Sequence, residues 1–393
     1  MKIGILNLQY TRFNYGAVLQ AAALEDFIRK NVACEVEHIN YIPPKAPQPK
    51  ISLMTRLRWK GIGLLRRLSI IKETRPQVCV MAVKNAEVFE IFRQEWLTRT
   101  KALCGLSELE EASKHYDAVV VGSDQVWRLA YTSHTFPAFF LSFLPDRCRR
   151  IAYAASFGTD QWEGDDVVTA VAAACLKKFR AVSVREKSGM DICRDKFGIA
   201  ATHVLDPALL VGRSFFDSII DKADPEIKAS DFVYYKLRGG MCGFNDVQKL
   251  IAGLGHSIED IYYGSATSSS GETTHYYHPV ASWLGKLRAC KKMLVTDSFH
   301  GICFAILFEK DFIWIPNPGA GTSRLESLLG LLGLEDRKCT NFAKMQRMVK
   351  SESRIDYVQV SAQLATLRND SERFLLSALK KQGIYENSVC NDG

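Results

Sequence analysis

The chain has 393 residues, of which 47% are hydrophobic and 24% charged, and its formal net charge is +8. This length exceeds what one hydrophobic core usually serves, so two domains are expected, and the composition is that of an ordinary soluble protein. No apolar run approaches the roughly 18 residues that a membrane span needs, and no nucleic-acid-binding pattern accompanies the basic charge.

Neither the start of the chain nor its cysteines indicate a secreted or metal-binding protein. The sequence begins with a predicted strand at 2–8 and shows no signal-peptide pattern, so we expect a cytoplasmic location. The 11 cysteines are scattered without any C-x-x-C spacing, which favours free thiols over a metal site or a disulfide framework. The moderately basic charge favours anionic substrates or an anionic surface.

Apolar strands and amphipathic helices alternate along the first half, as is typical of a parallel sheet covered by helices. A helix is predicted at 16–31, and the strands are predicted at 2–8, 34–39, 118–121, 150–156 and 181–184. The pattern breaks at Leu205-Asp206-Pro207, where proline disfavours a continuing helix. The first domain is therefore expected to span residues 1–208.

A second set of alternating elements follows the break. Its predicted strands are 232–235, 258–262, 293–296 and 311–315, and its predicted helices include 246–252, 284–289 and 302–308. We expect an α/β protein with a second domain at 209–345 and a helical tail at 346–393. Within that tail, the helical residues 357–383 are expected to pack across both halves.

Residues 50–75 form a basic segment that stands apart from both halves. Eight lysines and arginines but only one acidic residue, Glu73, interleave there with leucines and Trp59. Such a segment either lies on an anionic membrane surface as an amphipathic helix or forms a solvated insertion. The first interpretation would place the protein on the inner face of the membrane as a peripheral protein.

His300 follows the predicted strand 293–296 and precedes an apolar helical run. In an α/β sheet this places its imidazole at the carboxyl end of a strand and near a helix N-terminus, where ligands and anions bind. An imidazole in that position can hold a phosphate or transfer a proton. The alternative is a histidine that is hydrogen-bonded only within its own turn.

Four polar clusters share one position, the end of a predicted strand. They are Asn14-Tyr15-Gly16, Gly122-Ser123-Asp124-Gln125, Arg185-Glu186 and Ser298-Phe299-His300-Gly301. Taken singly, Asn14 can be a helix cap, Asp124 a turn former and Arg185 a surface ion pair. Their recurrence at one edge of a sheet instead indicates a cleft between two domains, where the helix that opens at Gly16 can present N–H groups to an anion.

In their order along the chain these clusters resemble the polysaccharide pyruvyl transferase family. The matching blocks begin at Asn14 and Asp117, continue with 153–158, 183–186 and 205–207, and end with Thr296-Asp297-Ser298-Phe299-His300-Gly301 and Ser323-Arg324-Leu325. The resemblance covers roughly residues 1–340. It implies two Rossmann-like domains facing a central cleft, in a GT-B-like glycosyltransferase architecture. It also implies transfer of the enolpyruvyl group of phosphoenolpyruvate to a sugar, usually as a cyclic ketal, with no metal or cofactor.

The resemblance assigns roles to the clustered residues. Arg185 and Arg324 are candidates to clamp the phosphate and carboxylate of the donor. His300 is the candidate proton donor, and Asp124, Glu186 or Asp297 would accept protons from the sugar hydroxyls. The catalytic set is thus His300, Arg185 and Asp124. The expected substrate-binding residues are Asn14, Tyr15, Gly16, Ser123, Gln125, Glu186, Lys236, Asp297, Ser298, Gly301 and Arg324.

One residue departs from the family pattern. Ser298 stands where many members carry an arginine two residues before the histidine. If that arginine holds the donor, another cation must replace it in this chain, and Lys236, Arg238 and Arg324 are the candidates.

The acceptor side is less defined by the sequence. Tyr234, Tyr235, Trp283 and the residues 276–278 either stack on sugar faces or pack in the core. In such relatives the acceptor is commonly a lipid-linked saccharide, which would give the basic segment a docking role. The alternatives are a glycosyltransferase that uses a nucleotide sugar and a non-catalytic saccharide-binding scaffold, because a fold alone does not fix a function.

Overall fold

The computed structural model describes residues 1–44, 83–237, 243–262, 264–267, 273–317, 321–351 and 354–380. The basic segment 50–75 and Arg238 lie outside the described residues. None of the helices in the described ranges is both long enough and apolar enough to cross a membrane.

The first half forms a six-stranded sheet in the order β2-β1-β4-β5-β6-β7, with every neighbouring pair parallel. Its strands are β1 (Lys2–Leu6), β2 (Glu35–His38), β4 (Ala118–Asp124), β5 (Arg149–Ala155), β6 (Phe179–Val184) and β7 (Thr202–His203). The central strand β4 is buried along its whole length, as its run of three valines predicts for a strand covered on both faces.

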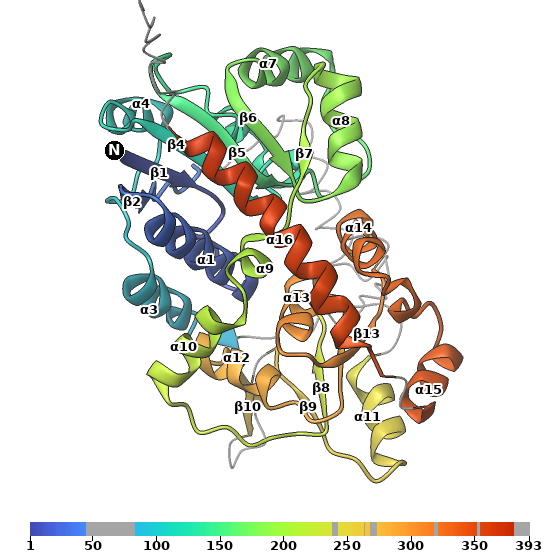
Figure 1. The fold of residues 1–393 in the computed structure, drawn as a ribbon. Helices are drawn as coiled ribbons and strands as arrows, with labels where there is room; N and C mark the ends of the chain where they lie inside the picture. Colours follow the sequence, from blue (N-terminus) through green and yellow to red (C-terminus); the bar gives the residue numbers. More distant parts are fainter. Residues whose placement is uncertain are drawn as a thin grey trace, which may run out of the picture.

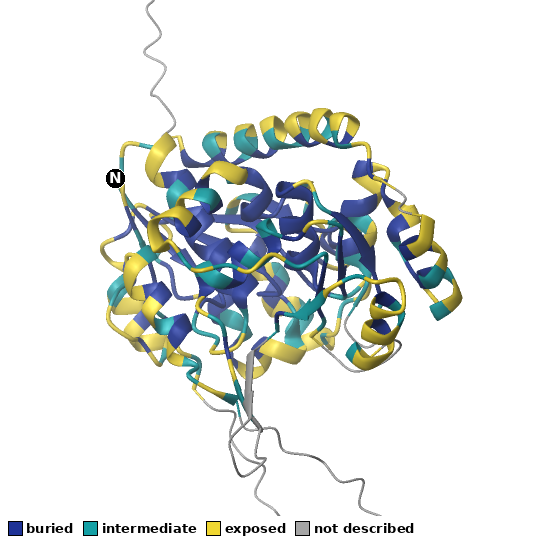
Figure 2. Cartoon of the chain, turned by 90° about the horizontal axis from the view of Figure 1, so that it is seen from below, coloured by how far each residue is buried: buried dark blue, intermediate teal, exposed yellow. Residues whose placement is uncertain are grey.

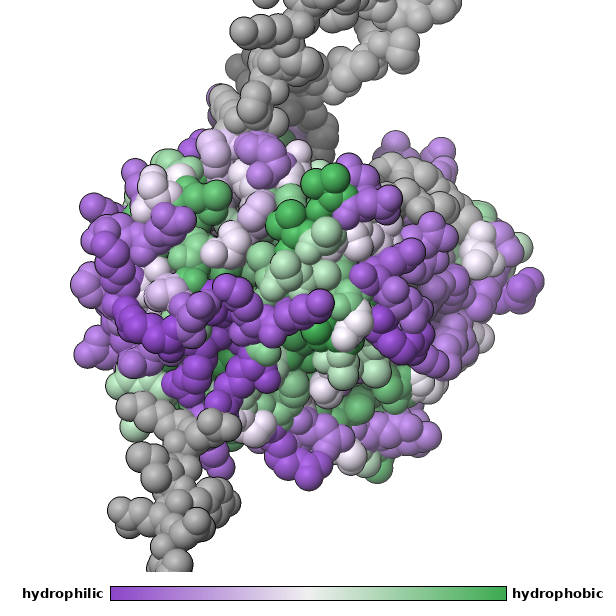
Figure 3. All heavy atoms as spheres, turned by 90° about the horizontal axis from the view of Figure 1, so that it is seen from above, coloured by the Kyte–Doolittle hydropathy of each residue, from purple (hydrophilic) through white to green (hydrophobic). Residues whose placement is uncertain are grey.

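The helices of this half lie on both faces of the sheet (Figure 1). They are α1 (Tyr15–Asn31), α3 (Glu87–Trp96), α4 (Leu106–Ser113), α5 (Leu129–Thr132), η1 (Ser133–Thr135), α6 (Phe136–Phe139), α7 (Asp166–Leu176) and α8 (Lys187–Phe197). Helix α1 is buried along most of its length because it packs against the sheet on one side and the second half on the other. Helix α7 lies at the outer edge and exposes Val167 and Val171, on the side from which Figure 3 is seen.

The second half forms a four-stranded parallel sheet in the order β13-β12-β8-β9. Its strands are β8 (Phe232–Tyr235), β9 (Ile258–Asp260), β12 (Met293–Thr296) and β13 (Asp311–Trp314). The surrounding helices are α10 (Arg213–Ala223), α11 (Phe244–Ala252), α12 (Val280–Arg288), α13 (Phe299–Leu307), α14 (Ser323–Leu332), η3 (Glu335–Arg337) and α15 (Phe342–Ser351).

Three elements join the halves. The short helix α9 (Pro207–Val211) leads from one to the other, and a small third sheet pairs β3 (Val83–Lys84) with β11 (Thr273–Tyr276), which also pairs with β10 (Gly264–Thr267). Helix α16 (Tyr357–Leu379) crosses the molecule (Figure 1). Its Val360 packs in the core of the second half, whereas Leu375 packs with residues of β1 and α1.

The two parallel, helix-covered sheets confirm the predicted α/β fold with two Rossmann-like domains. The central strands of both sheets are buried, and most exposed residues lie on the surrounding helices and loops (Figure 2). The largest core cluster contains residues of α1 together with residues of α12, α13 and β12. The halves are therefore joined by a continuous apolar interface next to the carboxyl ends of their strands.

Candidate active site

Side chains from the carboxyl ends of both sheets meet between the halves. Arg185 follows β6, and its guanidinium carbon lies 4.4 Å from the ring centre of Phe299, which begins α13 after β12. His300 Nε2 lies 3.5 Å from Asp206 Oδ2, at the start of α9. The predicted clusters after β4, β6 and β12 are thus brought together, as the carboxyl ends of parallel strands favour.

Asp206 is the centre of this cluster. Its Oδ2 atom lies 2.6 Å from Arg185 Nη1 and accepts a hydrogen bond of 2.7 Å from Ser123 Oγ, while Oδ1 accepts the N–H of Ala208. Burial alone would raise the pKa of the carboxyl, but His300, Arg185 and Ser123 together hold the pKa of Asp206 well below its usual range. Asp206 is therefore an ionised carboxylate in the interior.

Asp124 ends β4 with a strained backbone. Its φ is +76°, in the region that side-chain-bearing residues rarely adopt, and its Oδ1 accepts the N–H of Gln125. The same oxygen lies 3.5 Å from Arg185 Nη2. Gln125 in turn accepts a hydrogen bond from Arg128 and packs against Gly158. The carboxylate at the end of β4 thus lies against the buried Arg185.

His300 lies in the first turn of α13, directly after Phe299, the first residue of the helix. Ser298 caps this helix by accepting the N–H of Gly301, so the histidine is not the group that satisfies its own turn. The residue is 6% exposed, and its Nε2 atom has no hydrogen-bond partner among the described residues. Its other nitrogen packs against Gly16, where an added Cβ would lie 2.0 Å from Nδ1.

Arg324, on α14, is the second cation of the site. Its guanidinium carbon lies 5.8 Å from the ring centre of Phe299, and in the part of the chain that the structure describes its Nε atom has no hydrogen-bond partner. Burial, followed by the positive charge of Arg185, lowers the pKa of Arg324 to about 10. The residue lines a small pocket with Asp297, Phe299, Trp314, Asn317, Gly321, Thr322 and Leu325.

Glu186 is buried among backbone donors. Its Oε1 accepts hydrogen bonds from Ser156 Oγ and from the N–H groups of Phe157 and Gly158. Burial raises the pKa of this carboxyl, although Arg185 and Arg324 oppose the shift. Glu186 is fully buried, and these three hydrogen bonds hold the loop 156–158 in place.

Other predicted residues occupy supporting positions. Asn14 caps α1 by accepting the N–H of Ala17. Tyr15 is fully buried and stacks on Trp283 at 4.7 Å, and Tyr235 packs edge-on against the same ring. Lys236 follows β8, next to Leu237, whose N–H donates to Asp297.

The halves also touch directly above these residues. Gly321 lies so close to the loop after β5 that an added Cβ would be 1.9 Å from the carbonyl oxygen of Gly158. The N–H of Lys187, at the start of α8, donates to Ser327 Oγ on α14 at 3.0 Å. These contacts hold the loop after β5 and the start of α8 against Gly321 and α14.

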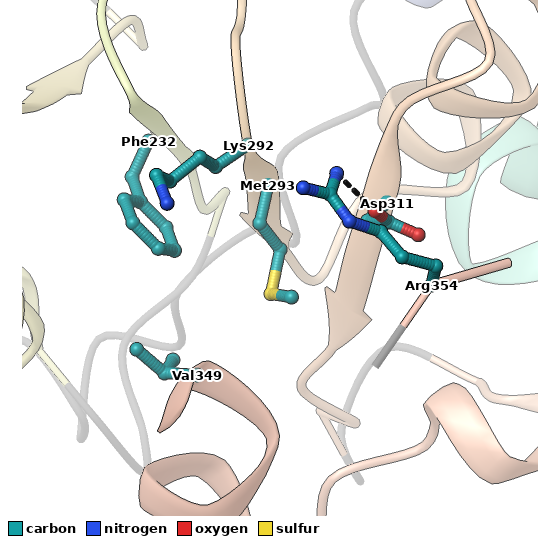
Figure 4. A pocket seen from close by; sticks show the side chains of 6 residues that line it. All are labelled: Phe232, Lys292, Met293, Asp311, Val349 and Arg354. Carbon is teal, nitrogen blue, oxygen red and sulfur yellow. Dashed lines mark hydrogen bonds and ion pairs between the residues drawn. The ribbon is translucent and has the colours of Figure 1, made fainter. Parts of the chain in front are cut away.

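The sequence patterns did not single out Asp206 or Phe299 as site residues. The signal was present for Asp206, because an aspartate directly before a proline marks a helix N-cap after a strand. A second small pocket lies elsewhere, at the amino ends of β8, β12 and β13, where Arg354 pairs with Asp311 (Figure 4). It is on the opposite edge of the second sheet from His300.

Comparisons with known proteins give a family match and structural resemblances. The family model described as polysaccharide pyruvyl transferase matches residues 14–318, and no curated protein matches significantly. Solved structures resemble the chain at low identity. The UDP-GlcNAc 2-epimerase of Neisseria meningitidis, bound to UDP-GlcNAc, is 10% identical, with a TM-score of 0.48 over 96% of this chain and 99% of that one. MnaA of S. aureus with UDP is 14% identical, with a TM-score of 0.49 over 95% of each chain.

Proposed function

The chain belongs to the polysaccharide pyruvyl transferase family. From this premise we propose that it moves the enolpyruvyl group of phosphoenolpyruvate onto two hydroxyls of a sugar, forming a pyruvate ketal and releasing phosphate. The observation that carries this proposal is the pair of arginines, Arg185 and Arg324, whose guanidinium carbons lie 4.4 and 5.8 Å from the ring centre of Phe299.

The two arginines differ in their partners, and the difference suggests which one binds the donor. The Nε atoms of both arginines have no hydrogen-bond partner among the described residues, but Nη1 of Arg185 lies 2.6 Å from Asp206, whereas Arg324 lines the pocket. A buried guanidinium with an unused donor is costly unless an anion completes it. We therefore assign the donor phosphate or carboxylate chiefly to Arg324, with Arg185 shaping the positive field.

This assignment also accounts for Ser298. The serine caps α13 through its side-chain oxygen, a role that an arginine side chain would not fill. The guanidinium of Arg324, on α14, lies over the ring of Phe299, the residue that follows Ser298. In this proposal Arg324 supplies the positive charge that other members carry at the position of Ser298.

His300 is the proposed proton donor. Its N–H bond breaks as the vinyl carbon C3 of the donor gains the proton, which leaves an oxocarbenium-like centre at C2. One sugar hydroxyl attacks C2 and loses its proton, and a second hydroxyl then displaces phosphate from the same carbon. General acid catalysis of this kind typically contributes about 10²- to 10⁴-fold in rate.

Asp297 is the carboxylate best placed to accept protons from the attacking hydroxyls. It lines the pocket that contains Arg324, whereas Glu186 is engaged by the loop 156–158 and Asp124 lies against Arg185. A base must lie within hydrogen-bond reach of the proton it removes, which favours a carboxylate that lines the pocket. The proposed acceptor is a saccharide, and we propose that it is linked to a lipid.

The test is product formation from phosphoenolpyruvate and a panel of saccharides with neighbouring free hydroxyls. We expect phosphate release that depends on an acceptor, and a product heavier than the acceptor by one pyruvate minus one water. Transfer of a sugar from a nucleotide sugar, with no reaction from phosphoenolpyruvate, would overturn the proposal in favour of a glycosyltransferase. Saccharide binding without turnover of either donor would instead favour a scaffold.

A further inference from the structure

Asp206 connects both halves of the site, although no pattern in the sequence assigned it a role. We infer that Asp206 is the positioning residue that orients the ring of His300, with Arg185 as the fixed counter-charge of the carboxylate. The inference deepens the proposed function and rests on it for the destination of the proton. The pairing itself can be tested without turnover.

The carboxylate of Asp206 is held rigidly in place. It is fully buried, and its Oδ1 caps α9 by accepting the N–H of Ala208 at 2.9 Å. The preceding residue, Leu205, donates its N–H to Ser371 on α16. One oxygen therefore anchors the side chain to the fold, which leaves Oδ2 facing the site in a fixed position.

The ring of His300 is confined on two sides. Its Nδ1 packs against Gly16, while its Nε2 faces Asp206 Oδ2 at 3.5 Å. That separation is too long for a hydrogen bond but short enough for a strong electrostatic interaction. The negative charge of Asp206 therefore faces Nε2 directly.

Arg185 keeps this arrangement from trapping the proton. It lies 2.6 Å from the same oxygen of Asp206, so the carboxylate already has a permanent partner. When Nε2 gives its proton to C3 of the donor, the electron pair stays on the imidazole and Asp206 remains paired with Arg185. The other titratable groups around the pair are Asp124, Tyr153, Glu186, Cys303 and Arg324.

The test is the NMR titration of the His300 ring, assigned by its loss in His300→Gln. Asp206→Asn removes the charge, yet asparagine is also a good helix cap. We expect the titration midpoint of His300 to fall by about one pH unit, the effect of losing an opposite charge within about 4–6 Å. The matched control is Asp311→Asn, a buried aspartate paired with Arg354, which should leave that midpoint unchanged.

A second variant covers the case in which Asp206→Asn fails to fold. Ser123→Ala keeps the carboxylate but removes one donor to Oδ2, so the charge on Asp206 is less dispersed and the midpoint of His300 should rise. An unchanged midpoint in whichever variant folds would overturn the inference. Failure of wild-type turnover with phosphoenolpyruvate would refute the proposed function while leaving this titration result standing.

The pH dependence of turnover provides an independent reading. If Asp206 positions His300 and its negative charge acts on the ring, the Asp206→Asn substitution should lower kcat and move the kcat–pH profile to lower pH. KM for phosphoenolpyruvate should change little. A loss of activity with an unmoved profile would show that the residue only supports the fold.

Discussion

Gly16 lies directly against the ring of His300, so that a Cβ at this position would be 2.0 Å from Nδ1 and 2.3 Å from Cγ. The second residue of α1, in the first half, therefore sets the position of a side chain that belongs to the second. No larger residue fits there without moving the ring. Glycine at this position is required by a close approach across the two halves.

We expect Gly16→Ala to reduce turnover by about 10²-fold, because a displacement of about 1 Å in a reacting group can have that effect. Steady-state kinetics with phosphoenolpyruvate would measure it. Gly105→Ala is the matched control, since this glycine also lies at the N-terminal end of a helix but its added Cβ meets no described atom nearer than 3.9 Å. Equal activities of the two variants would contradict the close-approach account.

The two arginines should separate stability from donor binding. Arg185→Ala leaves the buried carboxylate of Asp206 without its main partner, and breaking such a pair costs about 3–5 kcal/mol. Arg324→Ala removes a side chain without a comparable partner, so stability should change little while affinity for phosphoenolpyruvate falls. Chemical denaturation and calorimetric titration measure the two effects.

The control for that comparison is Arg354→Ala, which removes an arginine paired with a buried aspartate far from the site. It should leave donor binding unchanged. If Arg324→Ala binds phosphoenolpyruvate as well as this control does, Arg324 is not the donor clamp.

Acid stability should reveal the charge on Asp206. Its folded-state pKa is held below the unfolded value of about 3.9, so its contribution to stability is present above that pH and is lost as the pH falls. The difference in Tm between the wild type and Asp206→Asn should therefore shrink as the pH is lowered from about 5 towards 3. A constant or growing difference over this range would mean that Asp206 is not an ionised, stabilised carboxylate.

The contact between Gly321 and Gly158 should control closure of the cleft. Gly321 has φ +74°, and an added Cβ would clash with a backbone oxygen of the other half. Gly321→Ala should open the halves, which small-angle scattering would detect as a larger radius of gyration, and should raise KM for the donor.

Gly333→Ala separates the clash from backbone strain. Gly333 has a similar φ of +64°, but an added Cβ there meets nothing within 4 Å. It should lose stability without changing the scattering curve. If both variants scatter like the wild type, the glycine contact does not hold the halves together.

Much of the fold was predictable because short apolar runs with polar boundaries define its strands. Strands β8 and β12 begin and end where the sequence predicted. Strand β4 runs further than predicted, to Asp124, because Gly122 and Asp124 still pair with Tyr153 and Ala155 of β5. The sequence alone does not distinguish a glycine whose backbone remains paired in the sheet from a glycine that ends the strand.

The site was predictable in its location but less so in its internal contacts. The rule that strand ends share one edge placed Asp124, Arg185 and His300 together. The partnership of His300 with Asp206, or of Tyr15 with Trp283, joins residues far apart in the chain and depends on how the halves pack. Local patterns carry no information about such packing, and for this reason Tyr15 looked like a binding residue although it lies in the core.

The most direct test of the account is the thermal stabilisation of the wild-type protein by phosphoenolpyruvate, measured beside a panel of nucleotide sugars. A ligand that binds only the folded state raises Tm in proportion to its affinity and concentration. We expect phosphoenolpyruvate to raise the Tm of the wild type and of Arg354→Ala but not that of Arg324→Ala. A shift with a nucleotide sugar and none with phosphoenolpyruvate would contradict it.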